Sequence, residues 1–187
     1  MSTAATTNSP ERKGNRGIKG IEHIGITVPN HEQAVAFFEQ AFGATPLFSL
    51  VTKNDPPMTF EDVGPKNGLR PGTAMVAVTM MRLANGANVE LFEIDYPGKK
   101  ESIGISDIGI SHFSLNVQDI NTATDAFVKA GGQLLEGPYE LGGQEEGEGN
   151  MGCFGLTPWG LLVEFERFDS PLQYDEGATE TRWFPSA

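Results

Sequence analysis

The sequence has few cysteines, few basic residues and no long apolar runs, and each shortage excludes something. Its single cysteine, Cys153, has no partner for an intrachain disulfide or a cysteine-based zinc site. Lys and Arg number 13 against 25 Asp and Glu, a net charge of −12. A surface this acidic repels phosphate backbones and anionic lipids, so we expect no nucleic-acid partner and no membrane partner. No run approaches the roughly 18 apolar residues that suggest a membrane-spanning helix. These absences together predict a reducing, cytoplasmic location.

The chain is long enough for one domain with a real core, since it has 187 residues of which 39% are hydrophobic. Residues 1–17 are small and polar and lack the apolar segment of a secretory signal, so we expect a disordered tail there. Residues 171–187 contain Tyr174, Trp183 and Phe184. These aromatic side chains predict that the C-terminal extension packs on the domain or on a partner subunit.

An internal repeat organises the residues between these ends. The segment IEHIGITV at 21–28 aligns with ISHFSLNV at 110–117, which places His23 on His112. Without a gap, the alignment continues through Phe38 with Phe127 and Gly43 with Gly132. Each copy therefore reads as a strand, a polar break and a helix that ends at glycine.

Each copy continues with further strands, the last of which carries one acid in an apolar run. These runs are NVELFEI around Glu90 and LLVEFE around Glu164. The pattern predicts an α+β fold of two tandem βαβββ modules, at 18–96 and 107–170. An Asn85-Gly86 turn of two residues would place Met81 opposite Glu90 on one face of a hairpin. Residues 52–70, with three prolines and no clean periodicity, read as an inserted loop.

The repeat singles out four residues with metal-binding chemistry: His23, Glu90, His112 and Glu164. A carboxylate in an apolar strand is costly to bury unless it is paired or bound to a metal. A pseudo-twofold between the copies would bring both histidine strands and both glutamate strands together. Imidazole and carboxylate ligands suit a divalent first-row metal, so we expect one ion of Mn, Co, Ni, Zn or Fe.

These features resemble the vicinal oxygen chelate superfamily, which contains glyoxalase I, methylmalonyl-CoA epimerase, extradiol dioxygenases and fosfomycin and bleomycin resistance proteins. The resemblance covers residues 18–170 and rests on IEHIGITV, NVELFEI, ISHFSLNV and TPWGLLVEFE in that order. It is nearest to the glyoxalase I and methylmalonyl-CoA epimerase type. It implies a curved mixed sheet around a central metal held by His23, Glu90, His112 and Glu164, and a homodimer.

The resemblance also frames the chemistry. A metal with two open positions would bind a small substrate through vicinal oxygens and act as a Lewis acid. Glu90 and Glu164 are then the candidate bases for proton transfer in an isomerase, epimerase or glyoxalase-like lyase. Glyoxalase I commonly has an Arg for glutathione where this chain has Thr27, so glutathione is disfavoured. Two alternatives stay open: an Fe(II) extradiol-type dioxygenase, and a protein that binds or sequesters a small molecule or antibiotic without turnover.

Overall fold

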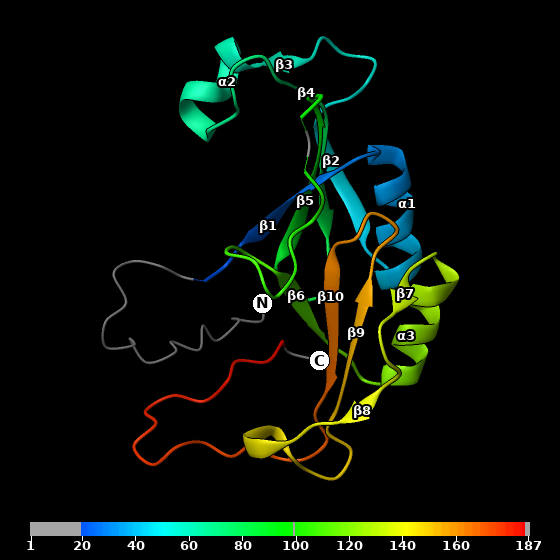
Figure 1. The fold of residues 1–187 in the computed structure, drawn as a ribbon, viewed down its shortest axis with the longest axis vertical. Coiled ribbons are helices and arrows are strands. Elements are labelled where there is room, and N and C mark those ends of the chain that lie inside the picture. The colour runs from blue at the N-terminus through cyan, green and yellow to red at the C-terminus, as the bar shows by residue number, and fades with distance from the viewer. Residues whose placement is uncertain (1–19, 99, 186–187) are drawn as a thin grey trace, which may run out of the picture.

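We describe the protein from a computed structural model that defines residues 20–98 and 100–185. The predicted tail at 1–17 lies outside these residues, as do the last two residues of the C-terminal extension. The two repeats fold as two similar modules, stacked along the long axis of the molecule (Figure 1). No helix in the described ranges is long and apolar enough to cross a membrane.

Module one contains the first seven elements of the chain. Its strands and helices are β1 (His23–Val28), α1 (His31–Phe42), β2 (Thr45–Val51), β3 (Met58–Thr59), α2 (Phe60–Asn67), β4 (Ala74–Arg82) and β5 (Asn88–Asp95). The strands form a mixed sheet in the order β1-β5-β4-β2, with β3 added to β4. Asn30 caps α1, its side chain accepting a hydrogen bond from the Gln33 amide, and Gly43 ends the helix at a left-handed φ of 64°.

Module two repeats this order with shorter middle strands. It contains β6 (His112–Asn116), α3 (Ile120–Lys129), β7 (Gln133–Leu134), β8 (Tyr139–Glu140), a 3₁₀ turn (Gly143–Glu145), β9 (Met151–Leu156) and β10 (Leu162–Arg167). Its sheet has the order β6-β10-β9-β7, with β8 added to β9. The predicted α+β fold of two βαβββ-type modules is confirmed, and each module has its own mixed sheet.

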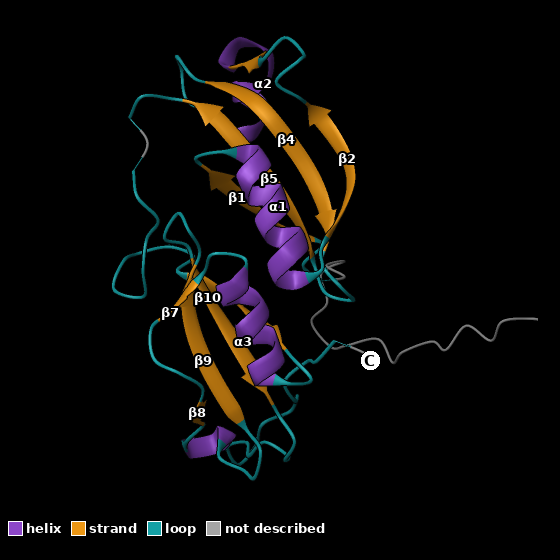
Figure 2. Cartoon of the chain, turned by 90° about the vertical axis from the view of Figure 1, so that its right-hand side faces the viewer, coloured by secondary structure: helices purple, strands orange, loops and turns teal. Residues whose placement is uncertain are grey.

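The main core lies on the side of the sheets that α1 and α3 cover (Figure 2). Phe38 of α1 and Phe127 of α3 are fully buried, and Phe127 also lies 5.5 Å from Phe37 between ring centroids. Strand residues such as Leu91 and Val163 complete this core. The two helices therefore join the modules through shared aromatic packing.

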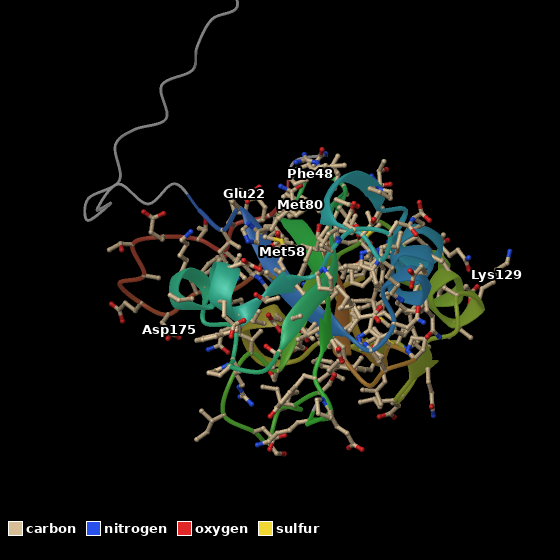
Figure 3. The ribbon with its side chains drawn as sticks, turned by 90° about the horizontal axis from the view of Figure 1, so that it is seen from above. Glu22, Phe48, Met58, Met80, Lys129 and Asp175 are labelled. Atoms are coloured by element: carbon tan, nitrogen blue, oxygen red, sulfur yellow. The ribbon has the colours of Figure 1, made fainter. Side chains whose placement is uncertain are left out.

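The opposite side of the sheets carries two different segments (Figure 1). In module one α2 lies there, and Val63 and Leu69 pack against a small cluster of buried β2 and β4 residues. In module two the C-terminal extension lies there; Figure 3 shows its Asp175 on the opposite side of the molecule from Lys129 of α3. This side, between α2 and the extension, is the one on which the candidate ligands lie.

Two expectations about module one need correction. Residues 52–70 are not an irregular loop throughout, because Phe60–Asn67 form α2. The Asp62 carboxylate starts this helix by accepting hydrogen bonds from the amide and hydroxyl of Thr59, at 2.9 and 2.8 Å. The hairpin register is also shifted by one residue, so Met80, not Met81, lies opposite Glu90.

The shift comes from the turn itself. Ala84 adopts a left-handed φ of 44°, and the Gly86 amide donates a hydrogen bond to the Leu83 carbonyl at 3.1 Å. The ladder is therefore centred on Asn85 rather than between Asn85 and Gly86. Because side chains alternate along a strand, the one-residue shift moves Met80 onto the face of Glu90 and Met81 into the helix-side core.

Candidate metal centre

Each module brings one histidine and one glutamate together on the same face of its sheet. His23 Nε2 lies 3.7 Å from Glu90 Oε2, and His112 Nε2 lies 3.5 Å from Glu164 Oε2. Two ligand atoms that are each about 2.1 Å from one ion lie roughly 3.0–3.5 Å apart. Each pair is therefore spaced so that a small movement would let both side chains bind the same metal. We call the sheet face that carries these pairs the site face.

The pairing follows from strand register. β1 runs parallel to β5 with Gly25 beside Glu90, and β6 runs parallel to β10 with Ser114 beside Glu164. The histidine in each module stands two residues before that partner, so it falls on the same face. The repeat seen in the sequence is thus reproduced residue for residue at the site.

Neighbouring side chains orient both imidazoles. His23 Nδ1 lies 2.6 Å from Glu22 Oε2, and Glu22 also accepts a hydrogen bond from Asn88 Nδ2 at 2.6 Å. These bonds lower the pKa of Glu22, the one with His23 more than the one with Asn88. In module two Ser111 Oγ lies 2.9 Å from His112 Nδ1. Holding Nδ1 in this way leaves Nε2, the atom nearer each carboxylate, for a metal.

Glu22 and Ser111 are not among the four site residues that the repeat predicts. Each directly precedes its histidine in the chain, and that shared position is the signal that could have found them. Alternation alone would have placed them on the other face of the strand. Both lie just before the first residue of the strand, outside its regular alternation, and their side chains reach Nδ1.

The two pairs do not meet within one chain. Among residues 20–98 and 100–185, no three His, Cys, Asp or Glu side chains are close enough to hold one ion. The donor chemistry fits a divalent metal, but each chain presents it as two half-sites: His23 with Glu90, and His112 with Glu164. The four candidate ligands are therefore brought together in twos and not as a set of four.

The wall around the first half-site is apolar. Met80 lies beside Glu90 on β4, and Phe92 follows it on the same face of β5. A Cβ atom at Gly25 would lie 3.2 Å from the ring of Phe92, so this glycine makes room for the ring beside the carboxylate.

The wall around the second half-site is polar. Glu166, only 4% exposed, follows Glu164 on the same face and accepts a hydrogen bond from Ser114 Oγ at 2.7 Å. Arg182 of the C-terminal extension forms ion pairs with Glu166 and with Glu145. Burial, and then the charge of Glu166, raise the pKa of Glu164, opposed by Ser114, His112 and Arg182.

Comparison with known proteins identifies the family. The profile of the Glyoxalase/Bleomycin resistance protein/Dioxygenase superfamily matches residues 20–165. That span covers nearly all of both modules and includes all four candidate ligands. The chain belongs to this superfamily, as its motifs predicted.

Individual similar proteins give a more specific comparison than the family profile does. A 2-epi-5-epi-valiolone epimerase from Actinomyces sp. is 29% identical over 175 residues, covering 90% of this chain and 91% of that protein. A glyoxalase family protein from Bacillus cereus has a TM-score of 0.63 at 17% identity, over 83% of this chain and 98% of the other. A fosfomycin resistance protein from Listeria monocytogenes, solved with Mn(II) and a dihydroxypropylphosphonic acid, has a TM-score of 0.50 at 14% identity, covering 81% and 93%. The structural matches show a shared fold.

Proposed function

We propose that this protein is a metal-dependent epimerase that moves a proton at a carbon atom of a small substrate with vicinal oxygens. One observation carries the proposal: each module presents a His Nε2 within 3.7 or 3.5 Å of a strand carboxylate at the same register. The epimerase relative at 29% identity supports epimerisation over the isomerase and lyase alternatives. No feature of the site favours the oxygenase or the pure binding protein.

The metal would be held by His23, Glu90, His112 and Glu164, through the two imidazole Nε2 atoms and the two carboxylates. When bound, a divalent ion supplies a Lewis acid that polarises a substrate carbonyl and lowers the cost of removing the neighbouring proton. Manganese is a reasonable first ion to test, because the structurally similar Listeria protein was solved with Mn(II).

The chain's own contribution is the proton transfer. Epimerisation needs one group to remove a proton from one side of a carbon and another to return it on the opposite side. Glu90 and Glu164 come from different sheets, so a substrate between the two half-sites would meet one carboxylate on each side. Phe92 and Met80 would exclude water on the side of Glu90, while on the side of Glu164 the neighbouring Glu166 is engaged by Ser114 and Arg182.

A complete centre requires the half-sites of two chains to face each other, and we therefore propose a homodimer. Both half-sites lie on the face of their strands opposite to Leu91 and Val163, which pack in the helix-side core. The linker between the modules exposes isoleucine side chains that a second copy would cover: Ile103, Ile105, Ile108 and Ile110. In a twofold dimer, module one of each chain would complete its site with module two of its partner.

Hydrogen exchange tests the reaction. The metal-loaded protein would be incubated in deuterium oxide with 2-epi-5-epi-valiolone, the compound in the relative's name, and then with a panel of hydroxy-ketones and 2-oxo acids that includes phosphorylated and carboxylated polyols. We expect deuterium at one carbon of a substrate, and loss of this exchange in Glu90→Gln and Glu164→Gln. Oxygen consumption without exchange would instead indicate the dioxygenase, and binding of a small molecule with neither would indicate a binding protein.

A further inference from the structure

We propose that a cavity at the carboxyl end of β1 and β5 binds a phosphate or carboxylate group on the far end of the substrate, with Arg70 as its main ligand. The inference rests on the proposed function, because it extends the site that the two His–Glu pairs define. It assigns the substrate to the class of elongated anionic molecules.

The cavity measures about 670 Å³, a size typical of small-molecule sites. It lies where four segments meet: the end of the insert after α2, the end of β1, the end of β5 and the linker between the modules. Residues with polar groups on its wall include Thr27, Arg70, Thr73, Tyr96, Lys100 and Trp159. Thr27 stands on the site face two residues after Gly25, so the cavity continues the same surface that carries His23 and Glu90.

Arg70 gives the cavity its preference for an anionic ligand. Its guanidinium lies over the ring of Tyr96, 5.9 Å from the centroid, and it forms no ion pair within the described part of the chain. By contrast, Lys53, Arg167 and Arg182 are each paired with carboxylates. A guanidinium that is stacked but unpaired keeps its N–H donors for a planar or tetrahedral anion.

The backbone around Arg70 is fixed in place. Its carbonyl accepts hydrogen bonds from the Thr73 amide at 3.2 Å and from the Thr73 hydroxyl at 2.7 Å, and Thr73 is 6% exposed. The neighbouring Leu69 packs against a small cluster of buried β2 and β4 residues that includes Val78. The position of Arg70 is therefore set by a short turn anchored to the core.

The other charged groups of the wall also favour an anion. Lys100 adds a second positive charge to the wall, against the single negative charge of Glu101. In a protein with net charge −12, a cavity wall with an excess of positive charge marks a place for an anion.

The position of the cavity sets the length of the substrate. Ile94, on the cavity wall, lies four residues after Glu90 on β5, which corresponds to about 13 Å along a strand. A substrate that chelates a metal at Glu90 and reaches this wall must therefore separate its vicinal oxygens from its anionic group by a distance of this order, about 13 Å. A phosphorylated or carboxylated polyol of this length fits, and a compact neutral molecule would leave Arg70 unused.

Calorimetric titration of the full-length, metal-free protein with pyrophosphate and, separately, with malonate tests the site. Arg70→Gln is the test variant, and Lys66→Gln is the matched control because Lys66 lies on the same insert but not on the cavity wall. We expect the wild type to bind at least one of the two anions. Removing a charge-assisted contact should weaken that binding about tenfold in Arg70→Gln, while Lys66→Gln stays within about twofold.

Preference for pyrophosphate would assign the substrate group as a phosphate, and preference for malonate as a carboxylate; both support the inference. Equal affinity of wild type and Arg70→Gln would overturn it, as would no binding of either anion by the wild type. Metal content measured on separate preparations of the wild type and of Arg70→Gln, purified without added metal and not stripped of it, keeps the two proposals apart. Loss of anion binding with the metal retained affects this inference alone, and absence of metal with anion binding intact affects only the proposed function.

Discussion

The two modules share a backbone but differ in what surrounds their half-sites. In both, the histidine strand pairs in parallel with the glutamate strand, and Gly25 beside Glu90 corresponds to Ser114 beside Glu164. Module one places Phe92 one step further along the site face, where module two places Glu166. Duplicated architecture thus preserves the ligand positions, while single substitutions next to them make one wall apolar and the other charged.

The modules also differ in the segment that covers the site side. Module one uses an insert with α2, held by apolar contacts of Val63 and Leu69. Module two uses the C-terminal extension, held by Arg182, whose guanidinium pairs with Glu166 and lies 4.9 Å from the centroid of Phe168. Each segment brings an arginine to the site side, but Arg182 is neutralised by acids and Arg70 is not. The difference suggests that one arginine has a structural role and the other binds a ligand.

The largest expected effect comes from removing the histidine of either half-site. His23→Ala and His112→Ala should each abolish exchange activity, because a metal loses one of its two imidazoles. Mixing the two inactive proteins under conditions that let subunits exchange should restore about one quarter of wild-type activity, since half the dimers then contain one intact site of two. A mixture that stays inactive would argue that both half-sites of one chain form the site.

The next largest effect concerns the aromatic packing that joins the modules. Phe127→Ala should lower the free energy of unfolding by roughly 3–5 kcal/mol, since this fully buried ring contacts α1 and β10. Val128→Ala is the control, because Val128 is next in the chain but 48% exposed. Urea denaturation measures both. Similar losses in the two variants would mean that α3 does not carry the shared core.

Removing the positive charge of Arg182, which pairs with Glu166 in module two, should have a smaller effect on the free energy of unfolding. Arg182→Met leaves Glu166 buried with Ser114 as its remaining partner, and should destabilise the fold by about 1–2 kcal/mol after allowance for the exposure of Arg182. The double variant Arg182→Met/Glu166→Gln should recover part of this loss, because no buried charge is left unpaired. If the double variant is less stable than the single one, the pair is not the reason for the loss.

The smallest expected effect is a difference in pH dependence between the N-caps of α1 and α3. Asn30→Ala should cost about 1 kcal/mol at any pH near neutrality. Asp119 caps α3 by accepting a hydrogen bond from the Thr122 amide, and this bond lowers its pKa. A pKa that is lower in the folded state than in the unfolded state stabilises the fold at pH values above the unfolded-state pKa. This stabilisation is lost as the pH falls through the folded-state pKa. The cost of Asp119→Ala should therefore shrink in acid, while that of Asn30→Ala does not; thermal melts across acidic pH would show whether the two differ.

Much of the fold could be predicted from the sequence because the same pattern of strands and helix occurs twice along the chain. Helices α1 and α3, the glutamate strands and the equivalence of His23 and His112 follow from alternation, caps and alignment. The hairpin register could not, because Ala84 takes a left-handed conformation that non-glycine residues rarely adopt. Helix α2 was missed because Gly64 and Pro65 interrupt its pattern, although Thr59 and Asp62 gave a capping signal.

The site was harder to predict than the fold. The four candidate ligands could be chosen from their equivalence in the two copies, but their arrangement depends on how the modules stack. Here α1 packs on α3, which leaves the two half-sites apart within one chain. The roles of Glu22, Arg70 and Arg182 arise from contacts between segments distant in sequence or from strand ends, where residue periodicity carries no information.

Metal analysis of protein purified without added metal is the most direct test of the account. We predict a stoichiometric divalent ion in the wild type that is lost in both Glu90→Gln and His112→Ala, since the four ligands act as one set. Retention of the ion in Glu90→Gln with loss in His112→Ala would contradict the four-ligand centre and indicate a three-ligand site. A protein that takes up no metal even after reconstitution would contradict the proposed enzyme as a whole.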